Sequence, residues 1–199
     1  MNLCDLHSFL LDHLIEDVMP FWIKHSVDWT NSGMWTCLAD DGTVLKRDKY
    51  IWSNARALWT FSALVNRIAG QHPDRVNSKI EETWRRAADN QYHFLERCGR
   101  DDNGYWIYVV DETGCTVIEG ENSIVVDAFA IYGLVEYFRL KCYDWAFAHF
   151  PVKEHGEWTQ KLDRFGHKID DLIALPVKDP YHLPRGLIIA IETLDRLTQ

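Results

Sequence analysis

The sequence KYIWSNARALW, residues 49–59, decides the fold of this chain. It contains neither Gly nor Pro, and its apolar residues recur at helical spacing. Trp52, Arg56 and Trp59 lie at i, i+4 and i+7, so they share one face of the predicted helix. A guanidinium beside two indole rings can stack on them and still donate hydrogen bonds, which suits a ligand with C–H faces and many oxygens, such as a sugar. The alternative is a buried helix face whose Arg reaches solvent past two core Trp residues.

The composition is typical of one protein domain with a sizeable core. The chain has 199 residues, of which 47% are hydrophobic. Its net charge of -9 and the lack of a basic stripe argue against nucleic-acid binding. No apolar run approaches the ~18 residues of a membrane span, so we expect no membrane association. The five cysteines include no CxxC pair and predict reduced thiols in a cytoplasmic protein, and we expect neither a metal nor another cofactor.

The pattern along the chain predicts helices that alternate with β-hairpins. Apolar periodicity predicts helices over residues 3–25, 49–69, 75–98 (capped by Asp74), 123–140, 143–150 and 184–197. Alternating stretches predict hairpins over residues 33–45, 104–120 and 156–169. Each hairpin begins with Gly-x-Trp, at Gly33, Gly104 and Gly156, which indicates a repeated unit of helices joined by a hairpin. The interval before Gly156 is too short for two full helices, so part of the repeat is missing there.

Three blocks of the sequence resemble the N-acylglucosamine 2-epimerase family, which includes cellobiose 2-epimerases and related aldose–ketose isomerases. The blocks run from Pro20 to Leu64, from Asp102 to Leu140 and from Phe150 to Leu187. The first and third are the most specific, with PFWIKHSVDWTNSGMW and YHLPRGL among their unusual residues. The resemblance implies an all-α fold, an (α/α)6 barrel of helical pairs with short β-hairpins on one rim and the sugar in the central cleft.

The chain is short for that family, because it supplies only five or six of the twelve helices that the resemblance implies. We therefore expect one domain over residues 1–199, an incomplete (α/α)6 toroid. In it an N-terminal part, 1–140, joins a C-terminal part, 143–199, across an internal deletion. By resemblance, the missing middle of the family barrel carries a His followed three residues later by Glu on a helix. Uncovered helix faces predict self-association as a homodimer, or poor solubility, at Phe129, Leu134, Phe138 and Phe147.

Epimerisation at C2 of a reducing sugar needs acid/base groups with a pKa near neutrality and fixed positive donors for the enediolate. His182, at the start of the last predicted helix, is the candidate base, because a helix N-terminus disfavours imidazolium. By resemblance, His182 matches the C-terminal catalytic His of the family, Arg185 its paired Arg, and Arg56 the Arg that holds the carbonyl-side oxygens. Trp52 would line one side of the cleft, and Glu157 would bind a hydroxyl group of the sugar. The alternatives are a helix cap for His182 and a solvated side chain for Glu157.

Two functions follow from these residues. In the first, the chain is a sugar 2-epimerase or isomerase with a small-molecule sugar as substrate. In the second, it is a non-catalytic remnant of that family that binds a sugar or a protein partner. Because the second catalytic His of the family lies in the missing middle, the resemblance predicts little or no epimerase turnover by this chain.

Overall fold

The computed structural model describes residues 2–120, 124–149, 151–152, 157–158, 165 and 167. The chain divides into two units, Met1–Leu140 and Lys141–Gln199. None of the helices within the described residues has the length and apolar character that crossing a bilayer requires. The single domain over residues 1–199 and its internal deletion stay predictions.

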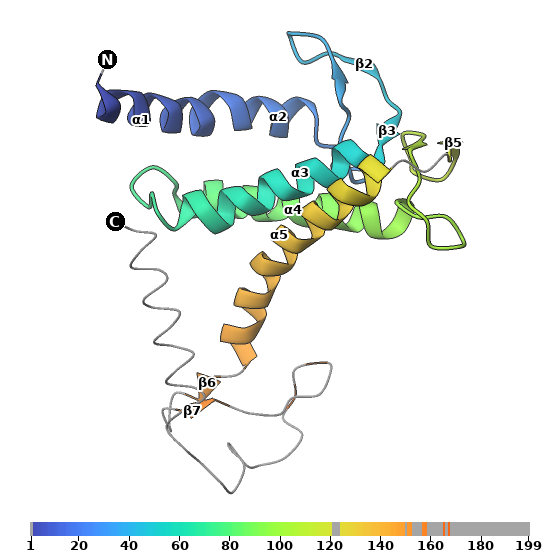
Figure 1. Ribbon diagram of the computed structural model, residues 1–199. Coiled ribbons are helices and arrows are strands. Elements are labelled where there is room, and N and C mark those ends of the chain that lie inside the picture. The colour runs from blue at the N-terminus through green and yellow to red at the C-terminus, as the bar shows by residue number, and fades with distance from the viewer. Residues whose placement is uncertain are drawn as a thin grey trace, which may run out of the picture. The chain divides into compact units, whose positions relative to one another are not determined.

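The N-terminal helix is continuous and contains one widened turn (Figure 1). It consists of α1, Leu3–Asp12, a π-type turn, His13–Val18, and α2, Met19–His25. Asn2 caps it by accepting a hydrogen bond from the Asp5 amide, and the Asp5 carboxylate accepts one from the Asn2 amide. In the widened turn the Met19 amide bonds to the Leu14 carbonyl, five residues back, just before Pro20, which has no amide hydrogen to donate. The helix predicted over residues 3–25 is confirmed.

Helices α3, Ile51–Ala63, and α4, Ser78–Cys98, pack against each other, and α3 continues into a second π-type turn, Leu64–Ala69. Their facing sides bury Leu58, Trp84 and Phe94 among others. The predicted start of α4 at residue 75 was wrong. Asn77 rather than Asp74 caps the helix, because the Asn77 side chain accepts hydrogen bonds from the backbone amides of Lys79 and Ile80.

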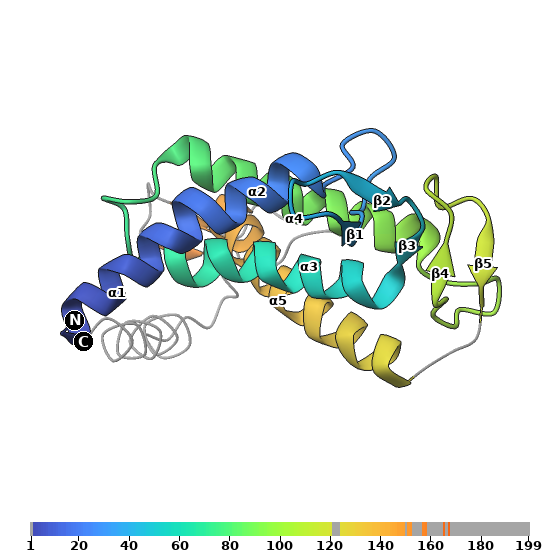
Figure 2. The same ribbon diagram turned by 90° about the horizontal axis from the view of Figure 1, so that it is seen from above.

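The β-strands are short, and β1 to β5 gather toward one end of α3 and α4 (Figure 2). Strands β1, Cys37–Leu38, and β2, Val44–Lys46, form the first predicted hairpin, and β4, Val109–Val110, and β5, Val117–Glu119, form the second. Strand β3, Lys49–Tyr50, pairs with β4, so α3 begins at Ile51 rather than at the predicted residue 49. Strand β6, Pro151–Val152, pairs with β7, Glu157–Trp158. Most of the third predicted hairpin, residues 156–169, lies outside the described residues.

Helix α5, Ile124–His149, is one helix across residues 140–143, where the sequence predicts little or no break between two helices. One side of it is buried against the rest of the first unit through Val126, Ala130, Tyr137 and Leu140. Gly133 lies where α5 passes close to α3, and an added Cβ there would clash with the carbonyl oxygen of Ala55. The absent side chain at Gly133 therefore sets how closely α5 approaches α3.

Candidate functional site

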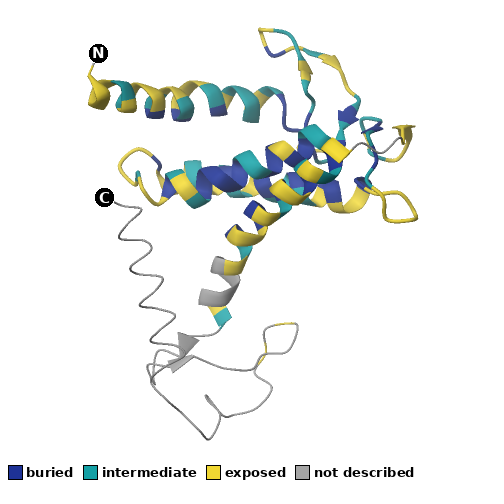
Figure 3. Cartoon of the chain, in the orientation of Figure 1, coloured by how far each residue is buried: buried dark blue, intermediate teal, exposed yellow. Residues whose placement is uncertain are grey.

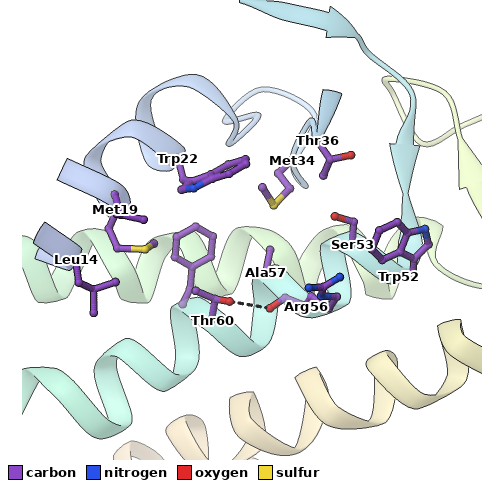
Figure 4. Close-up of a pocket in the computed structure, with 12 residues that line it drawn as sticks. Leu14, Met19, Trp22, Met34, Thr36, Trp52, Ser53, Arg56, Ala57 and Thr60 are labelled. Carbon is purple, nitrogen blue, oxygen red and sulfur yellow. Dashed lines mark hydrogen bonds between the residues drawn. The ribbon is translucent and has the colours of Figure 1, made fainter. Parts of the chain in front are cut away.

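A pocket of about 480 Å³ opens between the N-terminal helix and α3 (Figure 4). Its apolar end is formed by the N-terminal helix, with Leu14, Val18, Met19 and Trp22. Its polar end is formed by α3 and the segment before β1, with Thr36, Trp52, Ser53 and Arg56. The pocket thus presents stacking surface and hydrogen-bond groups at one end and hydrocarbon at the other.

Helix α3 supplies the polar end because of its periodicity. Trp52, Arg56 and Thr60 follow one another at intervals of one turn on the pocket side, and the Thr60 hydroxyl donates to the Arg56 carbonyl at 3.1 Å. Ile51 and Leu58 are fully buried on the other side of the helix. Burial of that side fixes the rotation of α3 and holds Trp52 and Arg56 at the pocket.

The Arg56 guanidinium lies over two aromatic rings. Its central carbon is 5.6 Å from the ring centroid of Trp52 and 5.1 Å from that of Phe129 on α5. The side chain is exposed, and no hydrogen bond or ion pair engages its guanidinium among residues 2–120 and 124–149. Its donors can therefore bind a ligand without first breaking an internal contact.

The predicted pairing of Arg56 with Trp59 was wrong. Trp59 stacks on Tyr132 of α5, with ring centroids 5.0 Å apart. The guanidinium carbon of Arg67 lies over the Trp59 ring, 5.3 Å from its centroid. Because α5 crosses α3, its aromatic residues reach both indole rings, and Phe129 rather than Trp59 becomes the second ring beside Arg56.

The segment that brings Met34 and Thr36 to the pocket is fixed by buried hydrogen bonds. The Met34 amide donates to the Asn54 side chain at 2.7 Å, and the Asn54 amide group donates to the Tyr50 carbonyl at 2.8 Å. Gly33 has φ +78°, and an added Cβ there would lie 2.7 Å from Cγ of Phe94. Only glycine fits this turn without displacing Phe94.

A buried ion pair also holds the residues just before Met34 in place. The Lys49 ammonium donates to the Asp28 carboxylate and to the Ser32 carbonyl, both at 2.7 Å, and both charged side chains are at most 2% exposed. Burial alone would raise the pKa of Asp28. Hydrogen bonds from Lys49 and from the backbone amides of Asn31 and Thr30 outweigh burial and lower that pKa below its usual value.

The lining residues can bind a polar ligand, but they hold no acid/base group. The indole of Trp52 offers a flat face to C–H groups, Arg56 offers charged donors, and the hydroxyls of Ser53 and Thr36 offer further hydrogen bonds. No His, Asp, Glu, Cys or Tyr is among the lining residues that the structure describes. The described lining therefore offers stacking surface and hydrogen-bond donors, and the described residues add no side chain of the kind that usually takes a proton.

The structure brings together two of the predicted site residues, Trp52 and Arg56. Glu157 lies in β7, opposite Val152 of β6. His182 and Arg185 lie outside the described residues, so their place beside Arg56 stays a prediction. Sequence reasoning missed Phe129, Ser53 and Thr36. Only Ser53 left a signal, three residues before Arg56 on the same helix.

Sequence comparison finds related sugar epimerases. Cellobiose 2-epimerase of Dictyoglomus turgidum is 30% identical over 144 residues, which cover 70% of this chain and 33% of that protein. Rat N-acylglucosamine 2-epimerase is 38% identical over 50 residues, which cover 25% of this chain and 12% of that protein. No family model matches the chain. The chain thus spans about a third or less of the curated relatives that it matches.

Structural comparison finds the same fold in solved enzymes. A cellobiose 2-epimerase from Bacillus thermoamylovorans superimposes with a TM-score of 0.60 at 20% identity, over 83% of this chain and 42% of that one. A cellobiose 2-epimerase from Spirochaeta thermophila gives a TM-score of 0.58 at 22% identity, over 98% of this chain and 50% of that one. These enzymes are (α/α)6 barrels, so the predicted fold class, an incomplete barrel of that type, is confirmed. In sequence and in fold, the chain is therefore similar to enzymes of the N-acylglucosamine 2-epimerase family.

Proposed function

We propose that this chain binds a small reducing sugar at the polar end of the pocket. The observation that carries the proposal is the Arg56 guanidinium, which lies over Trp52 and Phe129 with its donors unengaged by the described residues. A pyranose can lay a C–H face on an indole while its oxygens accept hydrogen bonds from a neighbouring guanidinium. The relatives are named as epimerases of cellobiose and N-acylglucosamine, which makes these sugars the first to test.

The chemistry that this site would favour is proton transfer at C2. Arg56 would stabilise the negative charge that develops on the enediolate oxygens, and His182 would be the base that takes the proton. Among the described residues, the lining itself holds no acid/base group. Since loss of one positioned acid/base group costs about 10²–10⁴-fold in rate, we propose little or no epimerase turnover by this chain.

Binding is tested by saturation-transfer NMR and calorimetry with cellobiose, N-acetylmannosamine and mannose. Arg56→Gln should abolish the signal or weaken binding at least tenfold, because the charged donors are lost. Arg86→Gln is the matched control: Arg86 also stacks on a Trp, Trp29, at 5.3 Å, but lies outside the pocket lining. Equal binding by wild type and Arg56→Gln would overturn the proposal.

Turnover is tested separately by solvent deuterium uptake at C2 of the sugar, followed by proton NMR. Wild type should exchange the C2 proton slowly or not at all, and His182→Ala should remove any exchange. Robust epimerisation by the purified chain would contradict the proposed inactivity. Exchange that survives His182→Ala would remove His182 from the mechanism.

A separate observation favours partner binding as a second function. Large apolar side chains of α5, including Ile131 and Phe138, are exposed in the described structure. Association of the chain with a further protein surface would bury them.

We also propose a cytoplasmic location, which the five free cysteines support.

A further inference from the structure

The N-terminal helix carries two neighbouring rows of apolar side chains. The first row is buried in the core and consists of Leu11, Ile15 and Met19. The second row, which we call the pocket row, lines the pocket and consists of Leu14, Val18 and Trp22. Its members are only partly buried, and Figure 3 shows buried and intermediate stretches in turn along this helix. The pocket row therefore presents apolar surface to the cavity beside the row that the core covers.

The two ends of the cavity differ in the chemistry that they offer. Figure 4 shows Leu14 and Met19 toward one end and Ser53 and Trp52 toward the other, where Arg56 also lies. The pocket row carries no hydroxyl, carboxylate, amide or charged group. Sugar hydroxyls placed against it would lose hydrogen bonds to water without replacement, whereas an alkyl or aryl group would lose none. The apolar end thus favours a hydrocarbon group over a second sugar ring.

We propose that the sugar bound in this pocket carries an apolar substituent on O4 and that the pocket row receives it. The proposal rests on sugar binding at Arg56. If Arg56 holds the oxygens at C1 and C2, a group on O4 points away from Arg56, because C4 lies across the pyranose ring from C1. The cavity of about 480 Å³ has the size and the mainly apolar walls of a small-molecule site. The ligand class is therefore a 4-O-alkyl or 4-O-aryl reducing sugar.

Affinity should rise with the length of the substituent. Calorimetry with glucose and with its 4-O-methyl, 4-O-butyl and 4-O-hexyl ethers measures this rise. Each CH2 group buried against the pocket row should tighten binding about fourfold, so the hexyl ether should bind about thirtyfold or more tighter than the methyl ether. Equal affinities across the series would overturn the proposal and leave sugar binding at Arg56 intact. Tighter binding of cellobiose, whose O4 carries a second sugar, than of the hexyl ether would also overturn it.

Polar substitutions in the pocket row test where the substituent lies. Leu14→Asn and Val18→Thr should each reduce the gain from the methyl to the hexyl ether to less than about threefold, because each places a polar group against the hydrocarbon. Val18→Thr changes the side-chain shape little, so it serves if Leu14→Asn unfolds the helix. Leu10→Asn is the matched control, because Leu10 is 55% exposed on the same helix and is not among the described lining residues. A gain that survives both pocket-row variants would overturn the proposal.

Arg56→Gln separates this proposal from sugar binding itself. If both hold, Arg56→Gln weakens every member of the series by about the same factor, and the dependence on length remains. If the hexyl ether binds wild type and Arg56→Gln equally but loses affinity in Leu14→Asn, sugar binding at Arg56 is wrong and the apolar site stands. Absence of binding by every member of the series would overturn both proposals.

Discussion

The Lys49 ammonium and the Asp28 carboxylate form a buried ion pair, 2.7 Å apart, that joins the strand before α3 to the loop leading into the pocket. Breaking such a pair leaves an uncompensated charge in the interior. We expect Lys49→Met to lower the free energy of unfolding by about 3–5 kcal/mol in urea titrations. The control is Lys46→Met, because Lys46 pairs with Asp48 at 2.8 Å on the surface and should contribute only about 0–1 kcal/mol. Similar losses for both variants would contradict a structural role for the buried pair.

The same pair makes stability depend on acid pH. Asp28 has a lowered pKa in the folded state, so its carboxylate stabilises the fold above the unfolded-state pKa of about 3.9. This stabilisation should fall as the pH drops below about 4 and should vanish below the folded-state pKa. We expect Asp28→Asn to have a shallower loss of stability between pH 5 and pH 2 than wild type, measured by urea unfolding at each pH. Parallel curves for the two proteins would show that Asp28 does not titrate with unfolding.

Gly33 should be intolerant of a side chain for two separable reasons. Gly33 and Gly104 both have positive φ, +78° and +87°, but an added Cβ meets Phe94 only at Gly33 and meets nothing within 4 Å at Gly104. Gly104→Ala should therefore lower the free energy of unfolding only by the cost of the positive φ, about 1–2 kcal/mol. Gly33→Ala should lose about 1–3 kcal/mol more, because Phe94 must move. Equal losses in thermal unfolding would show that the packing around Phe94 adapts.

Phe129 should contribute to the proposed sugar site through Arg56. Phe129→Leu removes the ring beneath the guanidinium and should weaken sugar binding about two- to fivefold, in line with about 0.5–1 kcal/mol for an exposed cation–π contact. Tyr132→Leu is the control, because Tyr132 stacks on Trp59 rather than beside Arg56. Calorimetry with a sugar that wild type binds provides the measurement. A larger loss of affinity for Tyr132→Leu than for Phe129→Leu would indicate that the sugar lies against Trp59 instead of Trp52.

The sequence predicts the parts of this fold that depend on local pattern. Helical spacing alone places Trp52 and Arg56 on one side of α3, and both line the pocket. Contacts that depend on tertiary packing were not predictable. Phe129 is distant from Arg56 in sequence, and only the crossing of α5 over α3 brings its ring to the guanidinium.

Local signals also failed where two residues compete for one role. Asp74 and Asn77 are both good helix caps, and the structure selects Asn77. Strand β3 has only two residues, Lys49–Tyr50, too few to show an alternating pattern, so its pairing with β4 was missed and α3 was predicted to begin too early.

The widened turn at His13–Val18 keeps the N-terminal helix in phase with the core. Leu11, Ile15 and Met19 are all buried although they are four residues apart, a spacing that drifts by about 40° per step around a regular helix. The wider turn absorbs this drift, because it takes up one more residue than a regular turn. Deleting a single residue within it would rotate everything before it by about 100°, turning Leu11 out to solvent while the Trp22 end of the pocket stayed in place.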